Sequence, residues 1–242
     1  MKTIGAYEKC RQYIESHSHL KDDSERYITN QQLPFITISR ETGAGADVVS
    51  ELLVELLQTF DKKNSVHWTV FDKNLIEKVL EDHNLPKLVS RYMSEDKHSD
   101  LSAALHEMLG LQPSRWTLVH HTTKTIIQLA RIGNVILVGR GANVITADFR
   151  NAVHVRLISP VENRINHVME FYNLNRKDAS EFIKREDVAR RKYVLSNYFK
   201  DVEDPGQYHL VINTGLTGYE HASEIIFEFV KKKFSEVFWE ND

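Results

Sequence analysis

The sequence predicts an α/β fold in which helices cover both faces of a parallel sheet. Short apolar segments rich in β-branched residues alternate along the chain with longer segments of helical spacing. Most of the short segments are continuous apolar runs, which is typical of strands that are buried on both faces. The chain has 242 residues, 41% of them hydrophobic, which is long enough for one domain with a full core.

Five strands are expected in chain order: Phe35–Ser39, Val66–Phe71, Asn134–Val138, Ala152–Ile158 and Leu210–Asn213. Helical spacing covers about 48–57, 73–82, 85–133 (with breaks near 94–100 and 110–113), 161–200 and 219–238. Asp72 is placed to cap the second of these helices, and Pro160 suits the first turn of the fourth.

Residues 1–34 are expected to be an appendage to a domain that spans 35–238. Residues 1–20 have the spacing of a short amphipathic helix, and 21–34 have the polar composition of a linker. The apolar C-terminal helix has a spacing that permits docking on the sheet or on another subunit, so a homo-oligomer stays open.

Composition excludes several classes of protein. A net charge of -3 gives no overall electrostatic case for nucleic acid. A single cysteine, Cys10, excludes an intramolecular disulfide framework and a cysteine-based zinc site. The 12 histidines form no convincing ligand set, so we expect no metal site of that kind. No segment approaches the about 20 apolar residues of a membrane span, and the start lacks a secretory signal, so we expect a cytoplasmic protein.

A glycine-rich loop, 40–47, joins the first strand to its helix. The N–H groups of a helix start bind phosphate, and Gly43 and Gly45 would let the backbone approach it. The loop departs from the usual phosphate-loop pattern, because Ala46 stands in the lysine position and Asp47 in the Ser/Thr position. Taken alone, the loop is equally a tight strand-to-helix turn.

Two other basic features have two interpretations each. Arg140, between Gly139 and Gly141, follows a strand at the sheet edge where ligands bind, or it is a surface arginine in a turn. Residues 184–192 carry five cations, which form either a solvated face with ion pairs or a mobile lid that brings arginines to a transferring phosphoryl group.

Five segments, taken together, resemble the cytidylate kinase-like family, a divergent branch of the P-loop nucleoside monophosphate kinases. In order, they are Ile36–Gly45 with its Ser-Arg-Glu-x-Gly-x-Gly pattern, Phe71–Ile76, Val135–Arg140, Leu157–Arg164 with Ser-Pro-x-x-x-Arg, and Asp204–Thr214 with Tyr-x-Leu-x-Ile-Asn-Thr. The resemblance covers about 35–232.

The resemblance implies a three-layer P-loop NTPase-like domain with a helical lid at about 161–200. It implies in-line transfer of the ATP γ-phosphate to CMP, dCMP or a related monophosphate, with Mg²⁺. The implied residues fall into three groups. The nucleotide loop is Gly43, Ala44, Gly45, Ala46 and Asp47; the monophosphate site is Asp72, Lys78 and Arg140; the cations at the transferring phosphate are Arg164, Arg185 and Arg191, with Arg40 as a candidate substitute for the missing lysine.

Three functions are therefore compared: a monophosphate kinase, a non-catalytic nucleotide-binding regulator on the same scaffold, and an interaction protein that binds no nucleotide. The absent lysine and hydroxyl favour the second, whereas the retained glycines, Arg140 and the cationic segment favour the first over the third. We expect the kinase.

Overall fold

The computed structural model describes residues 13, 33–60, 67–72 and 115–235. Its centre is a five-stranded sheet with the order β2-β3-β1-β4-β5. The strands are β1 (Phe35–Arg40), β2 (Thr69–Phe71), β3 (Val135–Val138), β4 (Ala152–Ile158) and β5 (Leu210–Asn213). Every neighbouring pair is parallel, so the predicted fold class is confirmed.

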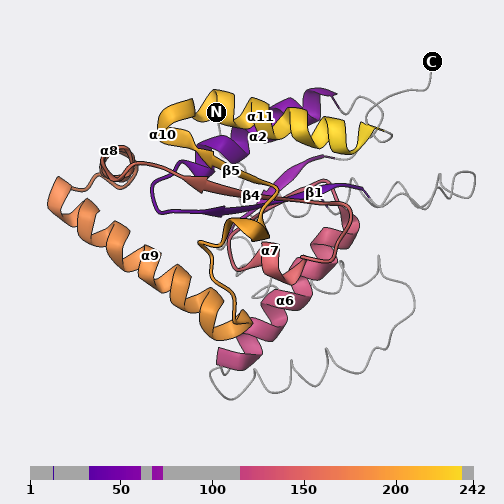
Figure 1. Cartoon of the computed structure of the whole chain (residues 1–242), viewed down its shortest axis with the longest axis horizontal. Helices are drawn as coiled ribbons and strands as arrows, with labels where there is room; N and C mark the ends of the chain where they lie inside the picture. Colours follow the sequence, from indigo (N-terminus) through magenta and orange to yellow (C-terminus); the bar gives the residue numbers. More distant parts are fainter. Residues whose placement is uncertain (1–12, 14–32, 61–66, 73–114, 236–242) are drawn as a thin grey trace, which may run out of the picture.

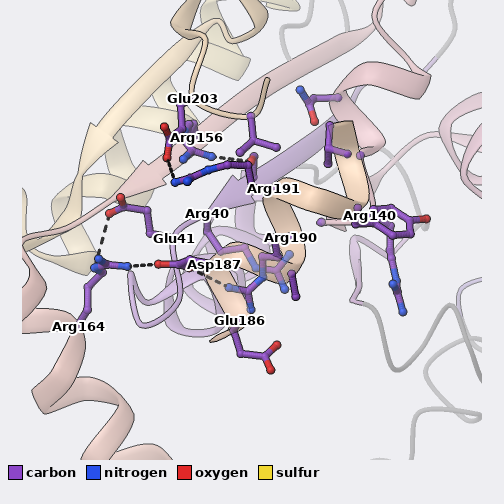
Figure 2. A pocket seen from close by; sticks show the side chains of 18 residues that line it. Arg40, Glu41, Arg140, Arg156, Arg164, Glu186, Asp187, Arg190, Arg191 and Glu203 are labelled. Carbon is purple, nitrogen blue, oxygen red and sulfur yellow. Dashed lines mark hydrogen bonds and ion pairs between the residues drawn. The ribbon is translucent and has the colours of Figure 1, made fainter. Parts of the chain in front are cut away.

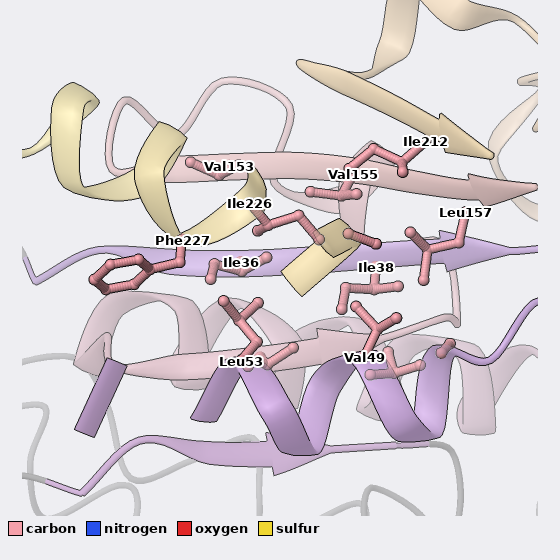
Figure 3. Packing of buried hydrophobic residues seen from close by; sticks show 14 of the residues in the cluster. Ile36, Ile38, Val49, Leu53, Val153, Val155, Leu157, Ile212, Ile226 and Phe227 are labelled. Carbon is pink, nitrogen blue, oxygen red and sulfur yellow. The ribbon is translucent and has the colours of Figure 1, made fainter. Parts of the chain in front are cut away.

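Helices cover both faces of the sheet, in three layers (Figure 1). On one face lie α2 (Ala46–Phe60) and α11 (Tyr219–Lys233), and on the other lie α6 (Arg115–Ile132) and the short α7 (Ala142–Ile145). Alternate residues of β1 point to opposite layers: Ile36 and Ile38 join the α2/α11 side, and Phe35 joins the α6 side. Figure 3 shows how the first layer is filled, with Leu53 of α2 and Ile226 of α11 packed over the central strands.

The stretch 161–200, expected as one long helical segment, forms two helices, and this expectation was wrong. They are α8 (Val161–Tyr172) and α9 (Arg176–Tyr198). Asn173 ends α8 in the left-handed conformation, at φ 52°, and the Asn175 side chain accepts a hydrogen bond from the Asp178 N–H at the start of α9. The two asparagines therefore form a corner, from which α9 runs towards α6 (Figure 1), and the Tyr198 hydroxyl near its end lies 3.4 Å from that of Thr123.

Five further elements either differ from the expected helices and strands or bear on them. The C-terminal helix docks on the sheet through Phe227, which is buried against α2 and the strands, whereas Phe238 lies outside the described residues. The expected strand at Val66–Phe71 begins only at Thr69 within the described residues. The expected helix at 73–82 lies outside them. Two short elements were not expected, a 3-10 turn at Pro205–Gln207 and α10 (Thr214–Thr217).

One residue of the expected N-terminal appendage lies in the core. Tyr13 is fully buried, and its ring meets the ring of Phe71 edge-on at 5.3 Å. The Tyr13 hydroxyl donates a hydrogen bond to the carbonyl of Gly133, just before β3. Among the helices of the described residues, none is long and apolar enough to span a membrane.

A buried histidine makes the fold sensitive to acid. His154 of β4 is 5% exposed, and its Nδ1 lies 2.8 Å from the Thr37 hydroxyl. Burial, together with the smaller effects of the neighbouring His209 and Lys233, lowers the pKa of His154 to about 4. Between about pH 4 and the ordinary value of about 6.5, the unfolded chain therefore binds a proton that the folded state rejects, so stability falls as the pH falls through this range.

We expect His154 to account for a loss of about 2 kcal/mol in the free energy of unfolding at pH 5 relative to pH 7.5. Urea unfolding of the wild type and of His154→Gln at the two pH values measures this loss, which the variant should largely lack. His221→Gln, which changes an exposed histidine on α11, serves as the control. If the free energy of unfolding of His154→Gln falls between pH 7.5 and pH 5 by as much as that of the wild type, the prediction is contradicted.

Candidate functional site

A cleft of about 390 Å³ lies where β1, β3 and β4 end, beneath α9. In a parallel α/β sheet this is the edge at which ligands bind. The cleft is lined by six arginines and four carboxylates (Figure 2): Arg40, Arg140, Arg156, Arg164, Arg190, Arg191, Glu41, Glu186, Asp187 and Glu203. The lining therefore carries an excess of positive charge in a chain whose net charge is negative.

Arg40, the last residue of β1, forms no ion pair with a carboxylate of the described residues. It is partly buried, and its guanidinium makes no hydrogen bond or ion pair with any of the described residues. Burial lowers the pKa of Arg40 to about 10, and the charge of Arg190 contributes, while Asp72 at the end of β2 acts in the opposite direction. The close approach depends on Gly139, because a Cβ there would lie 2.0 Å from Nη1 of Arg40. The structure therefore holds a concentrated, partly desolvated positive charge at the base of the cleft.

Arg140 follows Gly139 in a turn that requires left-handed backbone, with φ 55° at Arg140 itself. Its guanidinium lies 5.3 Å from the centre of the Tyr193 ring on α9, a cation–π distance. Figure 2 places Arg140 at the side of the cleft opposite Arg164.

Arg156 of β4 was missed by sequence reasoning. It is 6% exposed, its Nη1 donates a hydrogen bond to the Ser39 hydroxyl at 3.1 Å, and its guanidinium lies over the Tyr208 ring. The available signal was a charged residue inside the otherwise apolar run of β4, since charges are buried only where something balances or uses them.

The loop glycines face the protein's own helices. A Cβ on Gly43 would lie 2.6 Å from the backbone oxygen of Arg164 on α8, and one on Gly45 would lie 2.2 Å from the Tyr219 ring on α11. Ala46, in the lysine position, is buried in the core with Ala44. These glycines thus allow close packing inside the chain, and 43–47 do not line the cleft.

Asp47, at the start of α2, pairs with His167 of α8 at 3.4 Å between Oδ1 and Nε2. Burial raises the pKa of Asp47, but hydrogen bonds from His167 and from the N–H groups of Asp47 and Val48 outweigh burial, so the pKa is lowered overall. The hydrogen bond to Asp47 raises the pKa of His167 against the effect of burial. The carboxylate of Asp47 is thus held against α8 and does not line the cleft.

Arg40 and Glu41 are the loop residues that line the cleft, and they are followed by the buried Thr42. Its N–H donates to Oδ1 of Asp187 at 2.8 Å, and its hydroxyl donates to the same oxygen at 2.6 Å. Arg164 donates to Oδ2 of Asp187 at 2.6 Å, and Arg190 donates to the Thr42 hydroxyl. Burial lowers the pKa of Arg190, although Asp187 and Glu186 act in the opposite direction. A carboxylate from α9 therefore joins the loop to cations from α8 and α9.

The cleft brings together some of the residues implied by the resemblance and leaves others apart. Arg191 lines it and pairs with Glu203. Arg185 does not, because its side chain is 68% exposed and lies over the Phe182 ring. Lys78 lies outside the described residues.

The face of α9 explains why Arg190, and not Arg185, enters the cleft. The buried residues Ala179, Ile183 and Val194 define the inward stripe of this helix. Asp187 and Arg190 fall on the same stripe at helical spacing, whereas Arg185 falls on the opposite side. The stripe was readable in the sequence, and it was the signal that could have selected Arg190.

Among the described residues, no group of three or more His, Cys, Asp or Glu side chains is arranged to hold a metal ion. The guanidinium groups of the cleft present paired donors, an arrangement that suits phosphate.

Comparison with solved structures found chains that align over most of this one. A solved structure of an uncharacterized protein from Eubacterium ventriosum aligns over 82% of this chain and 98% of its own, at 19% identity and a TM-score of 0.60. Shikimate kinase from Acinetobacter baumannii in complex with shikimate aligns over 84% of this chain and 95% of its own, at 17% identity and a TM-score of 0.46.

A curated relative, uronate isomerase of Corynebacterium glutamicum, is 26% identical over 117 residues. The match covers 48% of this chain and 22% of that enzyme, so the chain corresponds to a minor part of it. The model of the cytidylate kinase-like family, by contrast, matches residues 35–216, from β1 to α10 and including every strand of the sheet. The chain belongs to the cytidylate kinase-like family.

Proposed function

We propose that the protein is a phosphotransferase of the nucleoside monophosphate kinase type, which transfers the γ-phosphate of ATP to CMP, dCMP or a related monophosphate. The observation that carries the proposal is Arg40, whose charge lies at the base of the cleft without a carboxylate contact among the described residues. A buried cation of this kind is costly unless a ligand supplies the missing negative charge. Phosphate groups of nucleotides are the ligand that the family suggests for it.

In this proposal the acceptor monophosphate lies between Arg40 and Arg140, near Asp72, with Lys78 as a further contact. Arg164, Arg190 and Arg191 surround the phosphoryl group in transfer, so Arg190 takes the place first given to Arg185. An oxygen of the monophosphate forms a bond to the γ-phosphorus, the bond to the β-phosphate oxygen breaks, and ADP leaves. Position and positive charge supply the catalysis, and no covalent intermediate is needed.

The residues present fit the phosphates of ATP better than they fit Mg²⁺. The arginines of the cleft can contact several phosphate oxygens at once. The residue in the position of the usual metal-binding hydroxyl is Asp47, and its carboxylate pairs with His167 instead. The described residues therefore form no ready Mg²⁺ site, and the arginines carry the charge compensation in this proposal.

A second function is a nucleotide-binding regulatory protein without turnover. It is favoured by the burial of Ala46 where a kinase lysine would lie, because no cation then reaches the phosphates from the start of α2. The arginine cleft serves this function equally well, so the two functions share a binding site and differ in the chemical step.

One experiment separates these functions. The purified full-length chain is mixed with MgATP and each of a panel of nucleoside monophosphates, and ADP release is measured beside the thermal shift. We expect turnover with one monophosphate, lost in Arg140→Ala and retained in Arg176→Ala, whose exposed arginine pairs with Glu162 outside the cleft. A thermal shift without turnover would support the regulator. If millimolar nucleotide produces neither turnover nor a thermal shift, both functions are overturned.

A further inference from the structure

The carboxylate of Asp187 occupies a place built for an oxyanion. Its Oδ1 accepts hydrogen bonds from the N–H and the hydroxyl of Thr42, at 2.8 and 2.6 Å, and from Arg190 at 3.4 Å. Its Oδ2 accepts one from Arg164 at 2.6 Å. A backbone N–H, a hydroxyl and two guanidinium groups are the donors that proteins use for phosphate. Asp187 is thus bound as a ligand would be.

One hydrogen-bond donor beside Asp187 has no acceptor while Asp187 occupies this place. Nε of Arg164 is buried and has no hydrogen-bond partner among the described residues, and the nearest carboxylate oxygen, from Glu41, lies 3.7 Å from it. An unsatisfied buried N–H of a charged group is unfavourable. A larger anion with more oxygens could satisfy it from the same position.

The charges also favour a larger anion. Three guanidinium groups meet two carboxylates here: Asp187 pairs with Arg164 and Arg190, Glu41 pairs with Arg164, and Arg190 lies close enough to Arg40 to lower its pKa. A phosphoryl group carries close to two negative charges at neutral pH and offers three acceptor oxygens. It matches this donor set better than a carboxylate in charge and in number of acceptors.

We propose that Thr42, Arg164 and Arg190 form a binding site for one phosphoryl group, and that Asp187 is its built-in competitor, which the phosphoryl group must displace. The inference deepens the proposed function, since it rests on nucleotide binding in the cleft and names the residue that limits it. Asp187 and Arg190 lie on the same helix, so displacement requires α9 to shift or the Asp187 side chain to turn away while Arg190 stays in reach. A site open for a tenth of the time binds tenfold more weakly than an open one.

The test measures binding of inorganic phosphate to the wild type and to Asp187→Asn by titration calorimetry. Asparagine keeps the size of the side chain and an acceptor oxygen but removes the negative charge. We expect phosphate to bind Asp187→Asn about tenfold more tightly or better, because the competitor and its like charge are both weakened. Addition of Thr42→Val to this variant should remove the gain.

Glu181→Gln is the matched control, because it removes the same charge from an exposed carboxylate of α9 that does not line the cleft. Its phosphate affinity should stay within about twofold of the wild type. Equal gains in the two variants, or no gain in Asp187→Asn, would overturn the proposal. If Asp187→Asn does not fold, Asp187→Ser takes its place, since serine is too short to reach Thr42.

A crystal structure of the wild type grown in phosphate gives a readout that needs no variant. Phosphate at the Thr42 N–H with Asp187 displaced is expected, whereas phosphate elsewhere in the cleft with Asp187 still on Thr42 would overturn the inference. A tighter phosphate site in Asp187→Asn together with no nucleotide binding by any variant would refute only the proposed function. Nucleotide binding that Asp187→Asn leaves unchanged would refute only the inference.

Discussion

Arg40→Gln is expected to remove phosphate binding from the cleft without lowering the stability of the fold. A charge-assisted hydrogen bond is worth about 1.5–3 kcal/mol, so nucleotide affinity should fall about tenfold to a hundredfold. If the protein transfers phosphoryl groups, the rate should fall by about a thousandfold or more, as for other arginines at a transferring phosphate. The free energy of unfolding should be unchanged or higher, because Arg40 lies among other cations and contacts no carboxylate among the described residues.

Calorimetric titration with nucleotide and urea unfolding measure the two halves of this prediction on the same samples. Arg40→Lys keeps the charge and should retain part of the affinity, because lysine cannot present paired donors. Arg176→Gln, on the exposed start of α9, should match the wild type in both measurements. A loss of stability with binding retained would show that Arg40 serves the fold and not a ligand.

Gly43→Ala is expected to destabilise the protein by about 2–5 kcal/mol. The backbone of Gly43 has φ +81°, which costs any other residue about 1–2 kcal/mol. The new methyl group would also lie 2.6 Å from the backbone oxygen of Arg164, so α8 must move away, at a further cost of about 1–3 kcal/mol. Because Arg164 contacts Asp187, movement of α8 should also disturb the cleft.

Urea unfolding of Gly218→Ala separates these two contributions. Gly218 has φ +78°, but the nearest atom to a Cβ there is Oε2 of Glu220, at 3.8 Å. This control should therefore lose only the conformational part, about 1–3 kcal/mol, because its φ of 78° with ψ of 164° is a conformation that essentially only glycine adopts. If the free energy of unfolding falls equally in the two variants, α8 moves away from the new methyl group at Gly43 without a measurable cost in stability.

The sequence predicted the layered fold because each strand was marked by its own apolar run. The bounds of β4 and β5 were correct, since Pro160 follows the first and a helix start follows the second. The corner between α8 and α9 was missed, although Asn173 and Asn175 are the residue type that ends and begins helices. The sequence on both sides of this corner is charged and favours helix, so the three residues 173–175 were included in one predicted helix.

The candidate site was harder to predict, because it depends on which side of α9 faces the sheet. The sequence identified Arg40, Arg140 and the cationic segment, and it identified the family that the comparisons support. It could not show that Thr42 lies against Asp187, since these residues are 145 positions apart and only the packing of α9 brings them together. The resemblance implied that the loop glycines face a nucleotide, which stays a prediction; it gave no sign that their hydrogen atoms make room for α8 and α11.

Tyr13 bears on how this domain should be delimited. The family match begins at residue 35, with the first strand, and a shortened chain would naturally be cut there. Such a cut removes a fully buried aromatic ring from beside Phe71 and leaves the carbonyl of Gly133 without its donor. Loss of a buried aromatic side chain costs about 3–5 kcal/mol, which is a large share of the stability of an ordinary domain. The unit that folds therefore reaches further towards the N-terminus than the unit that relatives share.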